Sequence, residues 1–354
     1  MLHFIHSLVS GGAEKQLGLL ASGLDTSKFD VAVFCADDSN HNIDISRVQI
    51  IKSTTKKVFS PDFFKSIYRA IKIFDPHVIH VWLPASVSIP SLFFGWLMRK
   101  PVIFSYRNKM YFHRGLSFPE FVSVLLFSKK IISNHDIVDS NFLYKWLYKI
   151  KNGQVISNAV VVPNQYLESR SVASPGENMI FVGRLSEQKN PTRLVRALSG
   201  IDANLNWHLD IYGEGELRSE IEELVESLDL SSKISIHGYS TEIYSALQEA
   251  SLLLFPSIKE GMPNVLVEAM AIGTPVMASD IAGNRSIFGA DEMNCIAWVD
   301  PYDEKNMRET IEKLINGSYE LNDMTARATL VVEKFSLEVM LENYEQSYRE
   351  LVGI

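Results

Sequence analysis

The chain has 354 residues, of which 46% are hydrophobic and 21% are charged, a composition typical of a soluble globular protein with room for two domains. Its two cysteines, Cys35 and Cys295, are far apart and lack metal-ligand spacing, which argues against a disulfide framework and favours a reducing cytoplasm. No apolar run reaches the roughly 18 residues of a membrane-spanning helix. Residues 1–10 lack the features of a signal peptide, so we expect a strand there.

The net charge of −8 is distributed unevenly along the chain. Residues 1–174 carry 20 Lys and Arg against 12 Asp and Glu, a net charge of +8, whereas residues 175–354 carry 14 against 30, a net charge of −16. A basic half beside an acidic half suggests that each half binds a different partner. The alternative is that the surface charges changed by chance, without a function, and produced the same pattern.

The first half alternates short apolar runs with helical patterns, which predicts a parallel α/β domain. Residues 10–14 follow the first strand and lead into a helix, so the pair Gly11-Gly12 forms a close-approach loop suited to phosphate or sugar, although any tight turn can use it. The other expected strands are residues 31–35, 78–82, 101–105, 131–133 and 155–156, and the expected helices are residues 61–74, 86–98 and 140–148.

Residues 109–130 combine basic side chains at their ends with many aromatic and aliphatic side chains between them. Such a stretch can lie on an anionic membrane surface, and it can equally be a core helix with basic ends. Because the whole half is basic, we favour contact with an anionic membrane.

Residues 163–178 contain proline, glycine and polar residues without a period, and we interpret them as a linker. A buried strand then runs into Gly183, followed by Arg184, Lys189 and a helix with Pro191 at its first position. Two cations at the carboxyl end of a strand, beside a helix N-terminus, predict a site for an anion such as phosphate.

The apolar run Leu252–Phe255 predicts a buried parallel strand, and the loop after it contains Glu260. Pro263 and Gly273 mark the start and the end of a short helix that contains Glu268. Because ligands bind outside the carboxyl ends of parallel strands, both carboxylates could line one cleft at different depths. The alternative is two solvated glutamates on a surface helix.

The run from Glu260 to Asn264 and the spacing between Glu260 and Glu268 resemble the acidic signature of the retaining glycosyltransferases of family 4, which have the GT-B fold. The pattern Gly183-Arg184, followed by Lys189, resembles the diphosphate-binding motif of the same family. The resemblance implies two Rossmann-like domains facing across a cleft. It places the acceptor-binding domain at residues 1–165, the nucleotide-sugar-binding domain at 166–335, and a C-terminal helix crossing back to the first domain at 336–354.

The resemblance also implies a function. A sugar would move with retention from a nucleotide-sugar, which we expect to be UDP-linked, to a glycan or lipid-linked glycan acceptor in surface polysaccharide biosynthesis, on the inner face of the cytoplasmic membrane. Because no Asp-x-Asp occurs in the chain, we expect no metal and no other cofactor, and we expect no nucleic-acid partner. The implied catalytic residues are Arg184, Lys189 and Glu260; the implied donor-binding residues are Gly12, Gly183, Gly213, Gly238, Tyr239, Gly261, Met262, Pro263, Asn264, Val265, Glu268 and Gly283; Glu14, His80 and Arg107 would line the acceptor side of the cleft.

Several positions depart from the family pattern or allow another interpretation. Many relatives have a histidine where Arg107 stands, a glycine at Ala159 and a glutamate at Ser286. His80 could instead be a hydrogen-bonded core histidine. A GT-B-fold sugar-nucleotide epimerase and a non-catalytic sugar-nucleotide binder remain as alternative functions, and the sequence does not identify the sugar, the nucleotide or the acceptor.

Overall fold

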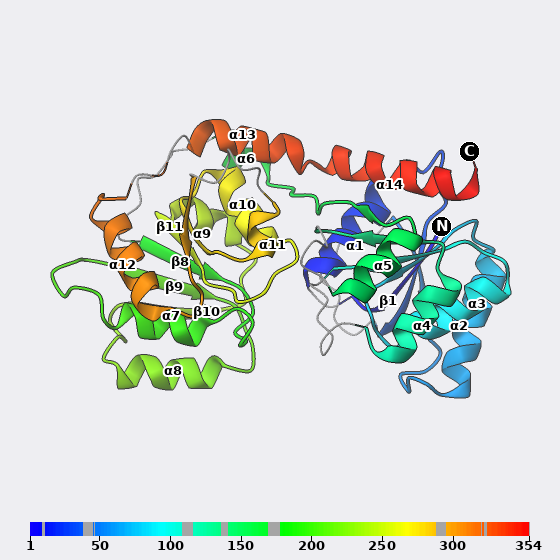
Figure 1. Cartoon of the computed structure of the whole chain (residues 1–354), viewed down its shortest axis with the longest axis horizontal. Coiled ribbons are helices and arrows are strands. Elements are labelled where there is room, and N and C mark those ends of the chain that lie inside the picture. Colours follow the sequence, from blue (N-terminus) through cyan, green and yellow to red (C-terminus); the bar gives the residue numbers. More distant parts are fainter. Residues whose placement is uncertain are drawn as a thin grey trace. The chain divides into compact units, whose positions relative to one another are not determined.

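The computed structural model describes residues 1–8, 11–37, 45, 47–107, 116–135, 141–168, 178–287, 295–319, 321 and 324–353 (Figure 1). Its internal contacts divide the chain into two compact units. Unit 1 comprises Met1–Ala159 and Phe335–Ile354, and unit 2 comprises Val160–Lys334. The division lies six residues before residue 165, where the resemblance places the end of the first domain.

Unit 1 is built on a parallel sheet whose strands, within the described residues, follow the order β3-β2-β1-β4-β5-β6-β7. Helices cover both faces of this sheet. On β1, Leu2 and Phe4 point into one core cluster while Ile5 points into the other, as the two-residue period of a strand requires. The strands are β1 (Leu2–Ser7), β2 (Ala32–Asp37), β3 (Gln49–Lys52), β4 (Ile79–Trp82), β5 (Val102–Tyr106), β6 (Lys130–Ser133) and β7 (Gln154–Val155), and the helices are α1 (Gly12–Gly23), α2 (Pro61–Phe74), α3 (Ser88–Leu97), α4 (Phe118–Phe127), α5 (Phe142–Ile150) and α14 (Leu337–Val352).

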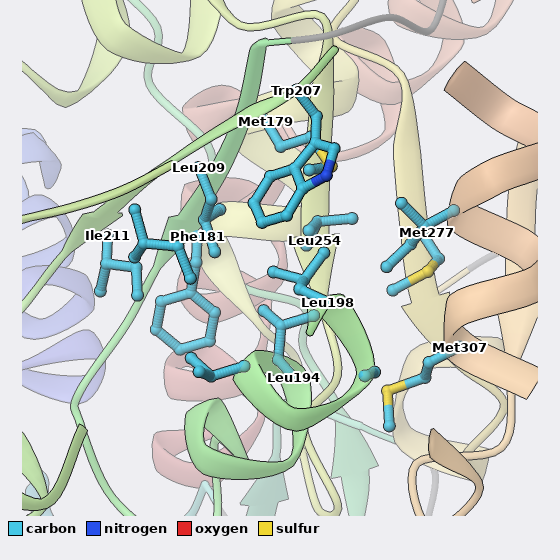
Figure 2. Packing of buried hydrophobic residues seen from close by; sticks show 14 of the residues in the cluster. Met179, Phe181, Leu194, Leu198, Trp207, Leu209, Ile211, Leu254, Met277 and Met307 are labelled. Atoms are coloured by element: carbon cyan, nitrogen blue, oxygen red, sulfur yellow. The ribbon is translucent and has the colours of Figure 1, made fainter. Parts of the chain in front are cut away.

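Unit 2 repeats this plan with a parallel sheet in the order β10-β9-β8-β11-β12-β13. Figure 2 shows one side of its core, where Phe181 and Leu254 of the central strands pack with Leu194 of α7 and Met307 of α12. The strands are β8 (Asn178–Val182), β9 (His208–Tyr212), β10 (Ile234–Gly238), β11 (Leu252–Phe255), β12 (Val276–Ser279) and β13 (Ile296–Val299), and the helices are α6 (Asn164–Glu168), α7 (Pro191–Leu198), α8 (Arg218–Ser227), α9 (Ile243–Glu249), α10 (Asn264–Ile272), α11 (Ala282–Arg285), α12 (Glu304–Ile315) and α13 (Met324–Lys334).

These two sheets confirm the predicted fold class of two Rossmann-like α/β domains. In each sheet the strand order reverses at one point, between β1 and β4 in unit 1 and between β8 and β11 in unit 2. A crevice at such a switch point is where open α/β sheets bind ligands. The predicted loops after β1, β8 and β11 therefore all lie at a switch point. None of the helices in the described part of the chain is long and apolar enough to cross a membrane.

The C-terminal helix α14, drawn in red in Figure 1, belongs to unit 1. A cluster of buried polar side chains holds it there. His80 of β4 is fully buried; its Nδ1 lies 2.8 Å from the hydroxyl of Tyr348, and its Nε2 lies 2.6 Å from Ser105 Oγ of β5. Arg107 lies over the ring of Trp82, at 4.3 Å from its centroid, and donates hydrogen bonds to Asn158 and to the hydroxyl of Tyr344. The strand ends of unit 1 thus anchor both tyrosines of α14.

This cluster predicts that acid destabilises unit 1. It includes the fully buried His3 of β1, whose Nδ1 accepts a hydrogen bond from Trp82 Nε1 at 3.0 Å. Burial lowers the pKa of His3 to about 3 and holds the pKa of His80 well below 6.5, whereas both rings titrate near about 6.5 in the unfolded chain. Below that pH the unfolded chain binds protons that the folded chain excludes. The free energy of unfolding should therefore fall as the pH drops below about 6.5, by about 1.4 kcal/mol per pH unit for each ring that stays neutral in the folded chain, which for His3 lasts to about pH 3; neither ring contributes above pH 7.

Urea unfolding at several pH values measures how the free energy of unfolding depends on pH. Hydrogen exchange in peptides that contain β4 shows whether the strand that carries His80 follows the same dependence. Since carboxylates also contribute at low pH, the comparison is with His80→Gln, which should show a shallower dependence between pH 6 and pH 5. Equal slopes in the two proteins would contradict the assignment.

Candidate functional site

A buried ion pair joins two of the predicted catalytic residues in unit 2. Lys189 Nζ lies 2.6 Å from Glu260 Oε1, and the glutamate is only 8% exposed. The ammonium group also lies 5.0 Å from the ring centroid of Phe255, the last residue of β11. Arg184 belongs to the same loop after β8 as Lys189, but its side chain is exposed to solvent. The structure therefore brings Lys189 and Glu260 together and leaves Arg184 at the surface beside them.

Backbone hydrogen bonds connect the loops at the carboxyl ends of the central strands. After β8, Gly183 N donates to Tyr212 O at 3.0 Å, and after β9, Gly213 N donates to Gly238 O at 2.7 Å. On the other side of β8, Ile258 N donates to Gln188 O at 2.9 Å, and the side-chain amide of Gln188 donates to Lys259 O at 2.9 Å. The loops after β8, β9, β10 and β11 thus form one connected layer around the ion pair.

Glycines allow the backbones in this layer to approach one another. A Cβ on Gly213, whose φ is +147°, would lie 1.9 Å from Gly183 O, and a Cβ on Gly283 would lie 2.1 Å from Glu260 O. Both distances are far below any real contact of a Cβ atom. These glycines, predicted to let the chain approach a ligand, are required already for the chain to approach itself.

Helix α10 begins directly after this layer and supplies the remaining predicted donor residues. Its N-cap residue, Pro263, makes no side-chain capping hydrogen bond, and the backbone N–H groups of its first turn lie at the positive end of the helix, where anions bind. Glu268 lies one turn further on and is 7% exposed. Gly261, Met262 and Pro263 are buried, Asn264 and Val265 are partly buried, and the other donor candidates, Gly238 and Tyr239, end and follow β10, with Tyr239 exposed.

Glu14 stands in the first turn of α1, next to the predicted loop after β1 that contains Gly12. Burial raises the pKa of its carboxyl group. A Cβ on Gly11 would lie 2.3 Å from Glu14 Oε2, so the carboxyl group folds back over this loop. The structure therefore places Glu14 and Gly12 at the switch point of unit 1.

His80 and Arg107, which were predicted on the acceptor side of the cleft, make their hydrogen bonds within unit 1. Both are buried in the cluster that anchors α14, with both ring nitrogens of His80 engaged. This favours the alternative of a core histidine and gives Arg107 the same structural role. In the predicted membrane stretch, Lys109 and Arg114 lie outside the described residues, and Lys130 is buried with its Nζ 2.9 Å from Glu350 Oε2, so it is not an exposed cation.

Three side chains of this site were missed by the sequence prediction. Gln188 ties the two loops together, and Asn190 donates from its side chain to the carbonyl oxygens of Pro256, at 3.1 Å, and Pro301, at 2.8 Å. Tyr244 of α9 places its hydroxyl 3.3 Å from Glu268 Oε1. No local pattern in the sequence marks these contacts, because their partners lie tens of residues away. Among the residues that the structure describes, no group of three or more His, Cys, Asp or Glu side chains could hold a metal ion.

Comparisons with known proteins match both units. The family model of glycosyl transferases group 1 matches residues 156–331, and the model of glycosyltransferase family 4 matches residues 10–164. The chain is 26% identical over 334 residues to the N-acetylgalactosamine-N,N'-diacetylbacillosaminyl-diphospho-undecaprenol 4-alpha-N-acetylgalactosaminyltransferase of Campylobacter jejuni, which covers 88% of this chain and 89% of that protein.

Solved structures show the same fold at low sequence identity. Anabaena HepE in complex with UDP-glucose has a TM-score of 0.80 at 16% identity and covers 99% of both chains. The lipopolysaccharide outer core galactosyltransferase WaaB, in its apo form, has a TM-score of 0.72 at 16% identity and covers 97% of this chain and 98% of that one.

The close backbone approach predicts a sharp contrast between two glycine substitutions in unit 2. Gly213→Ala places a methyl group against Gly183 O and should lower the free energy of unfolding by about 3 kcal/mol or more. Gly273→Ala is the matched control, because Gly273 also has a positive φ, +95°, but has no atom within 4 Å of the added Cβ. It should cost only about 1–2 kcal/mol. Thermal unfolding of both variants measures the difference, and similar losses would contradict the interlocked layer.

Proposed function

The chain belongs to the group 1 and family 4 glycosyltransferases of glycan and lipid-linked polysaccharide biosynthesis, and we propose that it moves a sugar with retention from a UDP-linked donor to a lipid-linked glycan. The observation that carries this proposal is the buried Lys189–Glu260 pair beside the uncapped N-terminus of α10. The Anabaena structure with UDP-glucose and the lipid-linked acceptor named for the Campylobacter relative support the donor and acceptor classes.

Lys189 would meet the charge that grows as the bond to the sugar breaks. The leaving group is a nucleoside diphosphate, so negative charge builds on its β-phosphate. An ammonium group has three N–H donors, so Lys189 can hold a phosphate oxygen without releasing Glu260. Arg184 in the same loop would donate two parallel hydrogen bonds from its planar guanidinium group to the phosphate. The backbone N–H groups of Asn264 and Val265 would contribute the positive end of the α10 dipole. These groups would do the work that a divalent metal does elsewhere, so we propose a metal-independent reaction.

The two glutamates would hold the donor at its two ends. Glu260 has one carboxylate oxygen on Lys189, and its other oxygen would accept hydrogen bonds from hydroxyls of the donor sugar. Glu268, deeper along α10, would accept from the ribose hydroxyls, as carboxylates do in other nucleotide sites. This arrangement assigns the sugar to the end of α10 nearest the phosphates and the nucleoside to the side facing α9.

A transfer assay tests this function against the two alternatives. The protein is incubated with labelled UDP-sugars and a lipid-linked glycan, with and without a metal chelator. Labelled acceptor plus UDP supports the proposal, an isomeric UDP-sugar would indicate an epimerase, and the absence of any product would indicate a binder. Loss of activity with the chelator would contradict the metal-free mechanism.

The same assay gives the first prediction for the site. Lys189→Ala and Arg184→Ala should each lower kcat about a hundredfold, because each removes a group that stabilises charge in the transition state. Lys305→Ala is the matched control, since Lys305 is an exposed cation of the same unit that pairs with Glu309 on its own helix at 3.7 Å. Near-normal turnover in both site variants would count against the assignment.

We also propose that unit 1 docks on an anionic membrane, through an aromatic patch formed by Phe93, Trp96 and Phe127. Their ring centroids lie 5.2–6.3 Å apart, and Trp96 is 52% exposed. The exposed cations Arg99 and Lys129 follow closely after the helices α3 and α4 that carry this patch. Exposed aromatic rings beside basic side chains suit the interface of an anionic bilayer.

Vesicle sedimentation tests the membrane proposal. Wild-type protein should bind anionic vesicles more strongly than neutral ones, and less at high salt, because screening shortens the reach of the cations. Trp96→Glu and Lys129→Glu should each weaken binding about fivefold or more. Leu330→Glu, which changes a similarly exposed apolar residue in unit 2, is the control. Equal recovery with both lipids, or equal losses in all three variants, would contradict the proposed surface.

A further inference from the structure

Asn190, the residue after Lys189, has a backbone conformation that is rare for its place in the chain. It is the N-cap residue of α7, and its φ of 61° and ψ of 36° lie in the left-handed region, whereas an N-cap residue usually has an extended backbone. Asparagine is one of the few residues besides glycine that adopt this region. Such a conformation persists only where the surrounding contacts hold it, and it is common at functional sites.

The side chain of Asn190 is also used differently from that of a usual N-cap asparagine. It makes no capping hydrogen bond to α7. Its Nδ2 instead donates to the carbonyl oxygens of Pro256, at 3.1 Å, and Pro301, at 2.8 Å, and the residue is 8% exposed. Pro256 directly follows β11, and Pro301 lies shortly after β13. The amide group therefore joins the loop that carries Lys189 to the ends of two other strands.

The contacts around this amide group determine its orientation. Arg193 Nη1 donates to Asn190 Oδ1 at 3.4 Å and to Pro301 O at 3.3 Å. Because a guanidinium group only donates and a carbonyl group only accepts, the amide oxygen must face Arg193 and the NH2 group must face the two carbonyl oxygens. An aspartate of the same shape would keep the contact with Arg193 but could not donate to either carbonyl oxygen.

The strand end that Asn190 holds is also the one against which Lys189 lies. The Lys189 ammonium group is 5.0 Å from the ring centroid of Phe255, the residue before Pro256, and 2.6 Å from Glu260 Oε1 in the loop that follows. The hydrogen bond from Asn190 to Pro256 thus fixes the backbone next to Lys189 relative to both contacts of its ammonium group. A functional side chain needs such support to stay in its productive place.

We propose that Asn190 is a positioning residue for Lys189, which it holds at the place where the β-phosphate of the donor binds. The inference rests on the proposed function for the role of Lys189. It extends the support of the site to the end of β13, since Pro301 shares the amide group of Asn190. Without this side chain, Lys189 is still present, but its ammonium group is free to leave that place. Asn190 therefore acts through Lys189 and not through a contact of its own with the ligand.

Calorimetric titration with UDP and with UMP tests this role, because the two ligands differ only by the β-phosphate. Asn190→Gly keeps the left-handed backbone and removes the amide group, whereas Asn190→Asp keeps the shape and removes both donated hydrogen bonds. Each variant should lower the preference for UDP over UMP about fivefold or more and leave the affinity for UMP unchanged. Asp229→Gly is the matched control, because Asp229 is an exposed residue of unit 2 with a φ of 58°, and it should keep the wild-type preference.

A double-mutant comparison shows whether Asn190 acts through Lys189. In the Lys189→Ala background, Asn190→Gly should lower the preference for UDP no further, since its effect depends on the lysine. Urea unfolding shows which variants are folded at the temperature of the titration, and Asn190→Asp replaces Asn190→Gly if the latter does not fold. A residue with a purely structural role would lower the free energy of unfolding and leave the preference for UDP as it is.

The outcomes separate this inference from the proposed function. If the wild type prefers UDP and the folded Asn190 variants keep that preference, the positioning role is wrong while the donor assignment stands. An equal loss of preference in the wild-type and Lys189→Ala backgrounds would also overturn it, because Asn190 would then act independently of the lysine. If the wild type shows no preference for UDP, the donor assignment fails and this inference fails with it.

Discussion

The buried ion pair between Lys189 and Glu260 is the interaction on which the site in unit 2 depends. Burying both charges is costly, and removing either partner leaves an unpaired charge at a cost of about 3–5 kcal/mol. The surrounding loops must therefore hold the two residues, which come from different strands, at hydrogen-bonding distance. The interlocked layer does this through Gln188 and through the close approach of Gly283 to Glu260. Because Lys189 is fixed in this way, it can meet the negative charge of a diphosphate without a rearrangement of the backbone. Electrostatic stabilisation of a leaving group requires such a preorganised charge.

The same kinds of side chain serve a different purpose in unit 1. His80 and Arg107 stand at the strand ends where a ligand site is expected, yet they anchor Tyr348 and Tyr344 of α14. The C-terminal helix is thereby part of the first unit, although the chain reaches it only after completing the second. The chain passes between the units twice, after Ala159 and before Phe335, and each unit folds around its own core.

The sequence was informative wherever a local pattern determines the structure. Apolar runs and glycine or proline boundaries were sufficient to predict β8, β11 and α10, whereas the strand order that brings Lys189 to Glu260 is set by the packing of the sheet. The contacts of His80 and Arg107 with α14 could not be predicted in this way, because Tyr348 and Tyr344 lie more than 230 residues away in the sequence. Gly213 and Gly283 were predicted to let the chain approach a ligand, but the backbone that each of them approaches in the structure depends on tertiary contacts that no spacing encodes. Lys130 shows the same limit, since burial and its partner Glu350 are set by the packing of α14.

The central claim is that Lys189, held by Glu260, binds the β-phosphate of the donor. Calorimetric titration with UDP and with UMP tests it directly, because the two ligands differ only by that phosphate. We expect the wild-type protein to prefer UDP, and we expect Lys189→Ala to reduce this preference about tenfold or more while leaving the affinity for UMP unchanged. An undiminished preference for UDP in Lys189→Ala would show that the β-phosphate is held by other groups and would contradict the account.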